Sequence, residues 1–293
     1  MSKSKADTIR PAKESKTKDV IKRMLRNKSS VIGLIILVIF VLAVALAGVI
    51  TDKELTTAQD ASIRLQPPSK EHPFGTDPYG RDVFARILFG GRISMSIGLF
   101  TAALSLIAGG LLGAVAAYYG GNVDNVIMRI MDMISAIPGT LLALAIVSAI
   151  GTSMINLMIA ITISSVPGFT RLVRSTVLTV VGSDYVEAAR ACGTKDLRII
   201  LKHIIPNAVG PIIVQTTASI ASMILLAAGM SFIGMGVQPP TPEWGAMISE
   251  AREFLRQCPY LVIFPGVAIV FTALSFNLIG DGLRDALDPR LRD

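Results

Sequence analysis

The stretch SSVIGLIILVIFVLAVALAGVIT, residues 29–51, contains no Asp, Glu, Lys, Arg or His. A bilayer core about 30 Å thick is crossed by roughly 20 residues of α-helix, since each residue rises about 1.5 Å along the axis. The run is longer than the apolar region of a signal peptide, which has about 7–15 residues, and no A-x-A-like cleavage site follows at 47–51. It therefore predicts a retained transmembrane helix near 31–50.

Further windows without charged residues or histidine follow this one, and one of them, 133–170, is too long for a single helix. Gly151-Thr152-Ser153 with Asn156 divides that window in two. We therefore expect an all-α membrane protein with six transmembrane helices. Their expected positions are 31–50, 93–118, 126–149, 154–173, 207–236 and 261–280. Four prolines inside these spans suggest bent helices around an interior path: Pro138, Pro167, Pro211 and Pro265.

The composition and the placement of charge agree with a membrane protein. Of the 293 residues, 52% are hydrophobic and 17% are charged, whereas soluble domains have about 45–50% and about 25%. The net charge of +7 is concentrated in a few segments, above all in the basic residues that precede the first span. Short segments rich in Lys and Arg stay in the cytoplasm, so we expect both termini to be cytoplasmic.

This topology divides the chain into regions. They are a cytoplasmic basic tail (1–28), the first transmembrane helix (29–51), an external loop with an amphipathic helix (52–92), a five-helix core (93–281) and a cytoplasmic tail (282–293). Within the core, loop 174–206 is expected inside and loop 237–260 outside. In the first external loop, Asp77-Pro78 is expected to start a helix that Gly90-Gly91 ends.

Several classes of function are disfavoured. The basic residues lie where membrane topology places them and are not interleaved with aromatic residues, so we expect no nucleic-acid partner. The spans hold no ionisable residue and no internal repeat is apparent, which argues against a proton-coupled carrier. The histidines, His72 and His203, lie at or beyond span ends, which argues against an intramembrane protease. Cys192 and Cys258 fall on opposite sides and cannot pair.

The chain is also expected to lack its own catalytic and metal sites. No G-x-x-x-x-G-K-[ST] phosphate loop occurs, so any ATP used for transport must be hydrolysed by another polypeptide. No cluster of His, Cys and Asp suggests a metal site. We therefore expect a non-enzyme without a cofactor of its own.

The cytoplasmic loop contains the sequence GSDYVEAARACG, residues 182–193. Asp184 followed three residues later by Glu187 is typical of a helix N-terminus with a cap, and Gly193 of a helix end. A short helix with a face of small residues is therefore predicted, on which a partner can approach closely.

The wider spacing resembles a known family. Glu187-Ala188-Ala189, then Gly193, then Ile205-Pro206 match the E-A-A, G, I-x-L-P motif of ATP-binding-cassette (ABC) importer permeases, with His203 in place of the consensus isoleucine and Ile205 in place of the leucine. Three further segments resemble signatures of the peptide and nickel branch of that family. Within this branch they are most similar to the C-type permease of dipeptide and oligopeptide importers. They are 72–94, 231–245 and 277–290.

The resemblance implies the type I importer permease fold in a bacterial plasma (inner) membrane. It also implies a homologous permease subunit, two cytoplasmic ATPase subunits that bind ATP and Mg²⁺, and an external substrate-binding protein. For this chain it implies that the 184–193 helix couples the permease to the ATPase. The residues that match are Asp184, Glu187, Ala188, Ala189 and Gly193.

In the second external loop, Thr241-Pro242-Glu243 is expected to begin an amphipathic helix that carries Trp244 and Glu250. It is either an interfacial anchor, since tryptophan favours the headgroup level, or an outer gate or seat for the binding protein. Glu243, Trp244 and Glu250 are the candidates for that role.

The substrate is left open by the sequence. Peptides follow from the resemblance alone, and close relatives carry nickel chelates or glutathione. A channel or scaffold subunit without an ATPase also remains open, and it predicts no ATPase partner.

Overall fold

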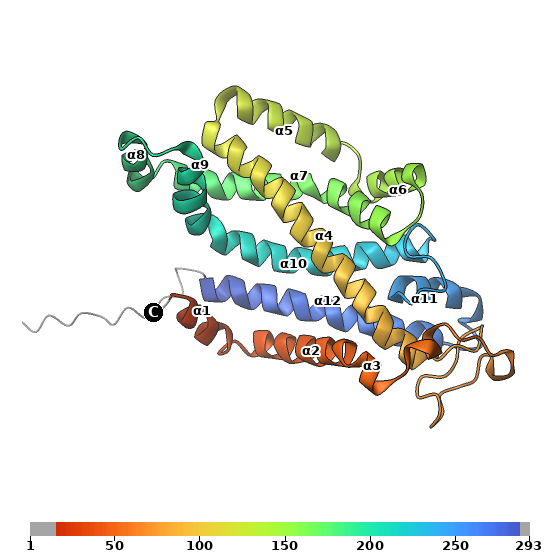
Figure 1. The fold of residues 1–293 in the computed structure, drawn as a ribbon. Coiled ribbons are helices and arrows are strands. Elements are labelled where there is room, and N and C mark those ends of the chain that lie inside the picture. Colours follow the sequence, from red (N-terminus) through yellow and green to blue (C-terminus); the bar gives the residue numbers. More distant parts are fainter. Residues whose placement is uncertain (1–15, 288–293) are drawn as a thin grey trace, which may run out of the picture.

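The computed structural model describes residues 16–287, so residues 1–15 of the predicted basic tail and 288–293 of the C-terminal tail lie outside it. The described residues form a bundle of helices with one isolated bridge between Thr76 and Asp82 (Figure 1). The α-helices are α1 (Lys16–Met24), α2 (Lys28–Ala45), α3 (Ala47–Ile50), α4 (Val83–Tyr119), α5 (Gly121–Ser135), α6 (Gly139–Ile150), α7 (Met154–Val181), α8 (Asp184–Ala191), α9 (Asp196–Ile199), α10 (Ile205–Phe232), α11 (Trp244–Ala251) and α12 (Tyr260–Leu287). Shorter turns are η1 (Lys53–Thr56), η2 (Ala61–Ile63), η3 (Ile200–Ile204) and η4 (Arg252–Phe254).

Within these residues, 5 helices are long and apolar enough to cross a membrane: α2, α4, α7, α12 and the continuous helix Asp196–Phe232 that contains α10. The predicted third span at 126–149 is not one straight helix. It is broken into α5 and α6, which are bent by 81° to each other. Pro138 precedes α6 and lacks a backbone N–H, and proline disfavours helical geometry in the residue before it. The spans number 6 if this bent pair counts as one.

The predicted amphipathic helix in the first external loop is part of the second span. Helix α4 begins at Val83 and continues through Gly90 and Gly91 without a break. A Cβ atom on Gly91 would lie 2.9 Å from a ring atom of Trp244. The expectation that these glycines end a helix was therefore wrong, because Gly91 makes room for a neighbouring side chain instead.

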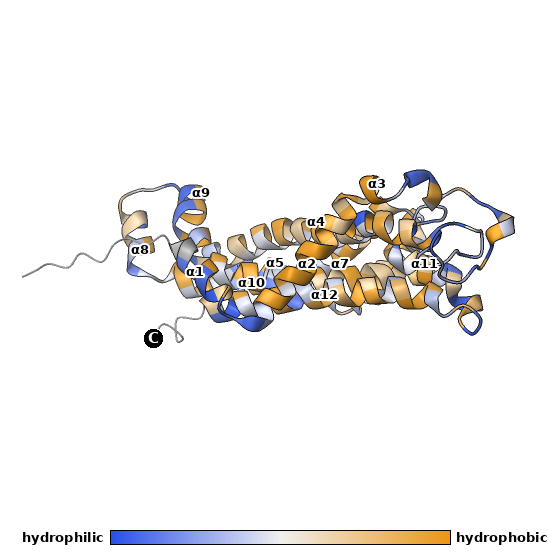
Figure 2. Ribbon diagram, turned by 90° about the horizontal axis from the view of Figure 1, so that it is seen from below, coloured by the Kyte–Doolittle hydropathy of each residue, from blue (hydrophilic) through white to orange (hydrophobic). Residues whose placement is uncertain are grey.

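The two ends of the bundle carry different segments. Helices α1, α8 and α9 lie with the C-terminal end of α12 at one end, and α11 lies with the loop before α4 at the other (Figure 1). Apolar residues cover the length between them, whereas polar residues gather at both ends (Figure 2). The segments expected on one side of the membrane thus lie at one end of the bundle, and those expected on the other side lie at the opposite end. Which end faces the cytoplasm stays a prediction.

The bundle depends on close contact between α4 and α7. A Cβ atom on Gly109 would lie 2.7 Å from the Cβ of Phe169 and 2.8 Å from the carbonyl oxygen of Val166. A Cβ atom on Gly113, one turn further on, would lie even closer to the carbonyl oxygen of Thr170. Glycines spaced as G-x-x-x-G allow two helix backbones to approach, because neither presents a side chain at the crossing.

We predict that Gly109→Val destabilises the protein by about 1–3 kcal/mol, since the added methyl groups overlap with α7 and force the helices apart. The measurement is thermal unfolding of the purified chain in detergent. Gly110→Val is the matched control, because a Cβ there meets no atom closer than 3.8 Å. An equal loss of stability in both variants would show that helix propensity is responsible instead of the close contact.

Candidate functional site

The helix predicted at 184–193 is present as α8, with one change at its start. Ser183 occupies the N-cap position, so Asp184 is the first helical residue and not the cap. Asp184 and Glu187 both lie in the first turn. Acidic side chains are favourable there because the helix N-terminus carries a partial positive charge.

The end of α8 requires glycine. Gly193 has φ +72°, its N–H donates to the carbonyl of Arg190 at 2.9 Å, and the N–H of Thr194 donates to the carbonyl of Ala189 at 3.1 Å. These two bonds are the pattern of a Schellman motif, in which the residue after the C-cap is left-handed. Glycine adopts that conformation without a steric penalty from a Cβ atom.

Helix α8 rests on the bundle by one side and exposes the other. Val186 is fully buried, in a cluster that includes Val177 of α7 and Ile204 of the turn before α10. Glu187 and Ala188 are exposed, as are the residues near the helix end up to Gly193, while Ala189 is half-buried. The predicted coupling residues therefore share one small helix at the end of the bundle.

The segment after α8 is held to α4. The hydroxyl of Tyr118, at the end of α4, donates to a carboxylate oxygen of Asp196 at 2.7 Å. The guanidinium of Arg190 lies 4.7 Å from the centre of the Tyr118 ring, in a cation–π contact. A displacement of α8 is therefore opposed by contacts with α4 as well as with α7 and α10.

A π-helical turn lies between α8 and the fifth span. Helix α9, the π-turn η3 and α10 follow one another without a gap, so that His203 and Ile205 of the sequence motif lie on this continuous helix. Such turns occur frequently at functional sites because they place an extra residue in the helix. The sequence contains no signal that would have revealed it.

At the opposite end, Glu243 and Trp244 are buried between α11 and α4. The Glu243 carboxylate accepts from the backbone N–H of Ala246 at 2.8 Å and from the hydroxyl of Ser94 at 3.0 Å. The indole N–H of Trp244 donates to the carbonyl of Ile87 at 3.0 Å. Both residues have an exposed fraction of 0%, so Trp244 packs inside the protein, where its ring fills the space beside Gly91. The role of α11 as an interfacial anchor, an outer gate or a seat for the binding protein stays a prediction.

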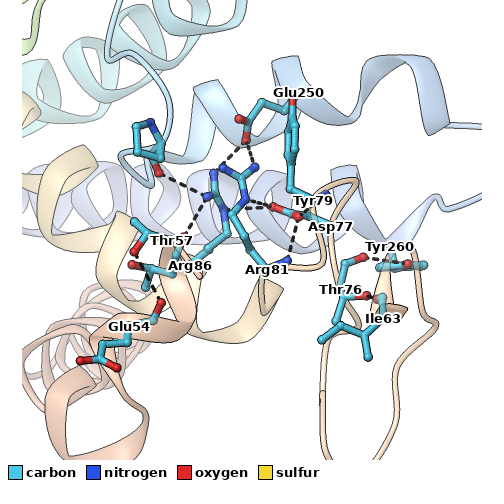
Figure 3. A network of polar contacts seen from close by, with 12 residues as sticks. Glu54, Thr57, Ile63, Thr76, Asp77, Tyr79, Arg81, Arg86, Glu250 and Tyr260 are labelled. Carbon is cyan, nitrogen blue, oxygen red and sulfur yellow. Dashed lines mark hydrogen bonds and ion pairs between the residues drawn. The ribbon is translucent and has the colours of Figure 1, made fainter. Parts of the chain in front are cut away.

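Glu250 belongs to a buried network of charges (Figure 3). One of its carboxylate oxygens accepts from Arg81 at 2.9 Å and from Arg86 at 2.8 Å. Asp77 also pairs with both guanidinium groups, at 2.6 Å to Arg81 and 3.5 Å to Arg86. Each arginine side chain is 1% exposed. Four charged side chains therefore join the first external loop, α4 and α11 into one unit.

Backbone groups complete this network. A terminal nitrogen of Arg86 donates to the carbonyl of Thr56 at 3.0 Å and to that of Pro240 at 3.3 Å. Buried guanidinium groups are stable only when their donors are satisfied. The pattern of the sequence does not single out Arg81 and Arg86 as a pair, and the one available signal is the presence of two arginines five residues apart beside a predicted span.

A pocket with a mostly apolar lining and a few polar side chains lies on the face of α7 and α10, both of which lie in candidate spans. Its volume is about 290 Å³, and its polar lining comes from serines and a glutamine. These residues are Ser165, Gln215, Ser219 and Ser222. Polar side chains are rare on surfaces that contact lipid tails, because hydrocarbon offers no hydrogen-bond partner. The pocket face is therefore suited to contact another protein surface or a water-filled path.

We predict that Glu250→Gln lowers the free energy of unfolding by about 3–5 kcal/mol, because it leaves two buried arginines facing a single carboxylate. The measurement is thermal unfolding of the purified chain in detergent. Glu253→Gln is the matched control, since Glu253 lies three residues further on and is exposed. If the two variants unfold at the same temperature, the network does not stabilise the end that carries α11.

Comparisons with known proteins agree on the family. Residues 109–293 match the family described as "Binding-protein-dependent transport system inner membrane component". Residues 15–68 match the "N-terminal TM domain of oligopeptide transport permease C". The chain is 46% identical over 275 residues to the dipeptide transport system permease protein DppC of Alkalihalophilus pseudofirmus, covering 94% of this chain and 90% of that protein.

A second relative and a solved structure extend the comparison. The glutathione transport system permease protein GsiD of Pectobacterium atrosepticum is 48% identical over 225 residues, which is 77% of this chain and 75% of that protein. The inward-facing MetNI methionine ABC transporter has a chain that covers 69% of this one and 97% of its own length, with a TM-score of 0.58 at 14% identity. At that identity the likeness concerns the fold alone, and it confirms the expected ABC importer permease fold.

The long family match, the match of the N-terminal domain and the apolar helices lead to one conclusion. The chain is a multi-pass inner membrane protein that belongs to the family of binding-protein-dependent transport system inner membrane components, within its branch of C-type oligopeptide permeases.

Proposed function

We propose that this chain is the permease subunit that moves di- or oligopeptides from an external binding protein to the cytoplasm by ATP-driven alternating access. The observation that carries this proposal is α8, a short helix with an exposed face at one end of the bundle. The peptide class rests on relatives at 44–46% identity whose names contain dipeptide or peptide transport.

Helix α8 is suited to receive a movement from a partner subunit. In our proposal its end of the bundle lies in the cytoplasm, where two ATPase subunits bind ATP and Mg²⁺. Glu187 is placed to pair with a basic residue of the ATPase, and the small side chain of Ala188 permits a close approach. Because Val186 is buried in a cluster that also contains residues of α7 and α10, a displacement of α8 is transmitted to these two spans.

The uncharged polar side chains of the pocket on α7 and α10 support a path between two permease subunits. Gln215, Ser219 and Ser222 offer hydrogen-bonding groups but no net charge. Such a wall holds a zwitterionic peptide weakly and releases it, which leaves the selection of substrate to the binding protein. In our proposal a homologous permease covers this face, because an exposed polar face is unfavourable against lipid.

Glutathione is the second candidate substrate, because relatives at 46% and 48% identity are named glutathione transport permeases. Nickel chelates remain an alternative that rests on the resemblance of the sequence alone. Among residues 16–287, no group of three or more His, Cys, Asp and Glu side chains is placed to hold a metal ion.

The test of this function is purification of the tagged chain in mild detergent, followed by identification of its partners and an assay of ATP hydrolysis. We expect a homologous permease and ATPase subunits. After reconstitution with the binding protein, we expect ATP-dependent uptake of labelled dipeptide. Competition by glutathione separates the two candidate substrates. Recovery of the chain without any ATPase in several detergents would favour the channel or scaffold alternative.

We predict that Gly193→Val abolishes uptake while the subunits still assemble, because valine is strained at φ +72° and unwinds the end of α8. The measurement is uptake together with ATPase stimulation by the loaded binding protein. Gly193→Asn should retain part of the activity, since asparagine tolerates this conformation.

Gly182→Val is the matched control for this prediction. Gly182 is also exposed, and a Cβ atom added to it would meet no atom within 4 Å. Its φ of −86° is one that valine adopts without strain. Normal coupling in Gly193→Val, or an equal loss in Gly182→Val, would contradict the role assigned to the end of α8.

A further inference from the structure

Helix α1 lies directly before the first span and is fixed in direction by α12. Asn27 caps α2 by accepting from the N–H groups of Ser29 and Ser30. The side-chain amide of Asn27 also donates to a carboxylate oxygen of Asp285 at 2.9 Å. The corner between α1 and α2 is therefore attached to the last turns of α12, and α1 packs against the same helix.

This attachment leaves one face of α1 uncovered. Val20, Arg23 and Met24, which share one side of the helix, are half-buried. On the other side, Ile21 is 52% exposed and Leu25 is 51% exposed. These two apolar side chains lie one turn apart, since the N–H of Leu25 donates to the carbonyl of Ile21 at 2.9 Å.

Basic side chains lie beside the exposed apolar pair. Lys22 and Arg26 are both exposed and also lie four residues apart, so they form a parallel row along the helix. Lys28 is exposed as well, at the start of α2. The acidic groups nearby are Asp19, which is half-buried, and Asp285, which is bonded to Asn27.

A face with adjacent apolar and basic rows suits the surface of a bilayer. Apolar side chains enter the boundary of the acyl chains, and basic ones contact the phosphates. The exposed apolar surface also continues into the first span, where Ile32 and Ile35 are 54% and 53% exposed. The exposed apolar side chains of α1 and of the first span therefore form one continuous surface.

We propose that the exposed face of α1, made by Ile21, Lys22, Leu25 and Arg26, binds the headgroups of anionic phospholipids at the membrane surface beside the first span. Ile21 and Leu25 set the depth of the helix, and Lys22 and Arg26 supply the preference for negative charge. This inference goes beyond the transport function and does not depend on which substrate the complex carries.

The test places a nitroxide label at position 25 of the full chain. Leu25→Cys is made in a Cys192→Ser, Cys258→Ala background and purified with the subunits that accompany it. The protein is reconstituted into vesicles of phosphatidylcholine alone or mixed with phosphatidylglycerol. Collision rates of the label with O₂, which partitions into hydrocarbon, and with a water-soluble nickel complex report where it lies.

We expect O₂ collisions to dominate in the mixed vesicles. Lys22→Gln combined with Arg26→Gln should lower the ratio of O₂ to nickel collisions to the value found in phosphatidylcholine alone. The matched control is Lys53→Gln with Lys70→Gln, two exposed basic residues at the other end of the bundle, which should leave the ratio unchanged.

Three results would overturn the proposal. Equal access of the nickel complex in all vesicles would place the face in water. Protection from both reagents in all vesicles would indicate that a partner protein covers it. A ratio that responds neither to phosphatidylglycerol nor to the loss of Lys22 and Arg26 would show that anionic headgroups are not recognised.

Discussion

Close contact between helix backbones is the constraint on which this bundle depends. In a bilayer the hydrophobic effect does not drive helices together, because lipid tails are as apolar as the side chains. Association then relies on van der Waals contact, which is strongest where small residues let backbones approach. Gly109 and Gly113 provide that contact for α4 and α7, and Gly33 provides it for α2 and α12.

Different kinds of interaction hold the segments at the two ends of the bundle. At the end that carries α11, the guanidinium groups of Arg81 and Arg86 lie between the carboxylates of Asp77 and Glu250, so α11 and the loop before α4 are fixed by buried charge. At the other end, α8 is attached by Val186 and by contacts of Tyr118 with Asp196 and Arg190. The end that carries α11 is therefore held by buried charge pairs, whereas α8 at the other end keeps one side exposed.

Polar residues also distinguish the lengthwise faces of the bundle. The outward faces of α2 and α12 carry large exposed apolar side chains such as Ile35 and Ile263, which suits lipid. The face of α7 and α10 carries the serines and Gln215 of the pocket. The faces of the bundle therefore differ in their polar content, although the spans look equally apolar in the sequence.

The sequence by itself determined the fold class, the approximate spans, the grouping of segments at two ends, the α8 helix with its end at Gly193, and the family. These features are local, since they depend on runs of apolar residues, on the conformational freedom of glycine and on motif spacing. Only the tertiary structure decided that Gly91 makes room for Trp244 and that Glu250 meets Arg81 and Arg86. Those outcomes depend on residues far apart in the chain, and a pattern along one segment carries no information on which distant segment will lie against it.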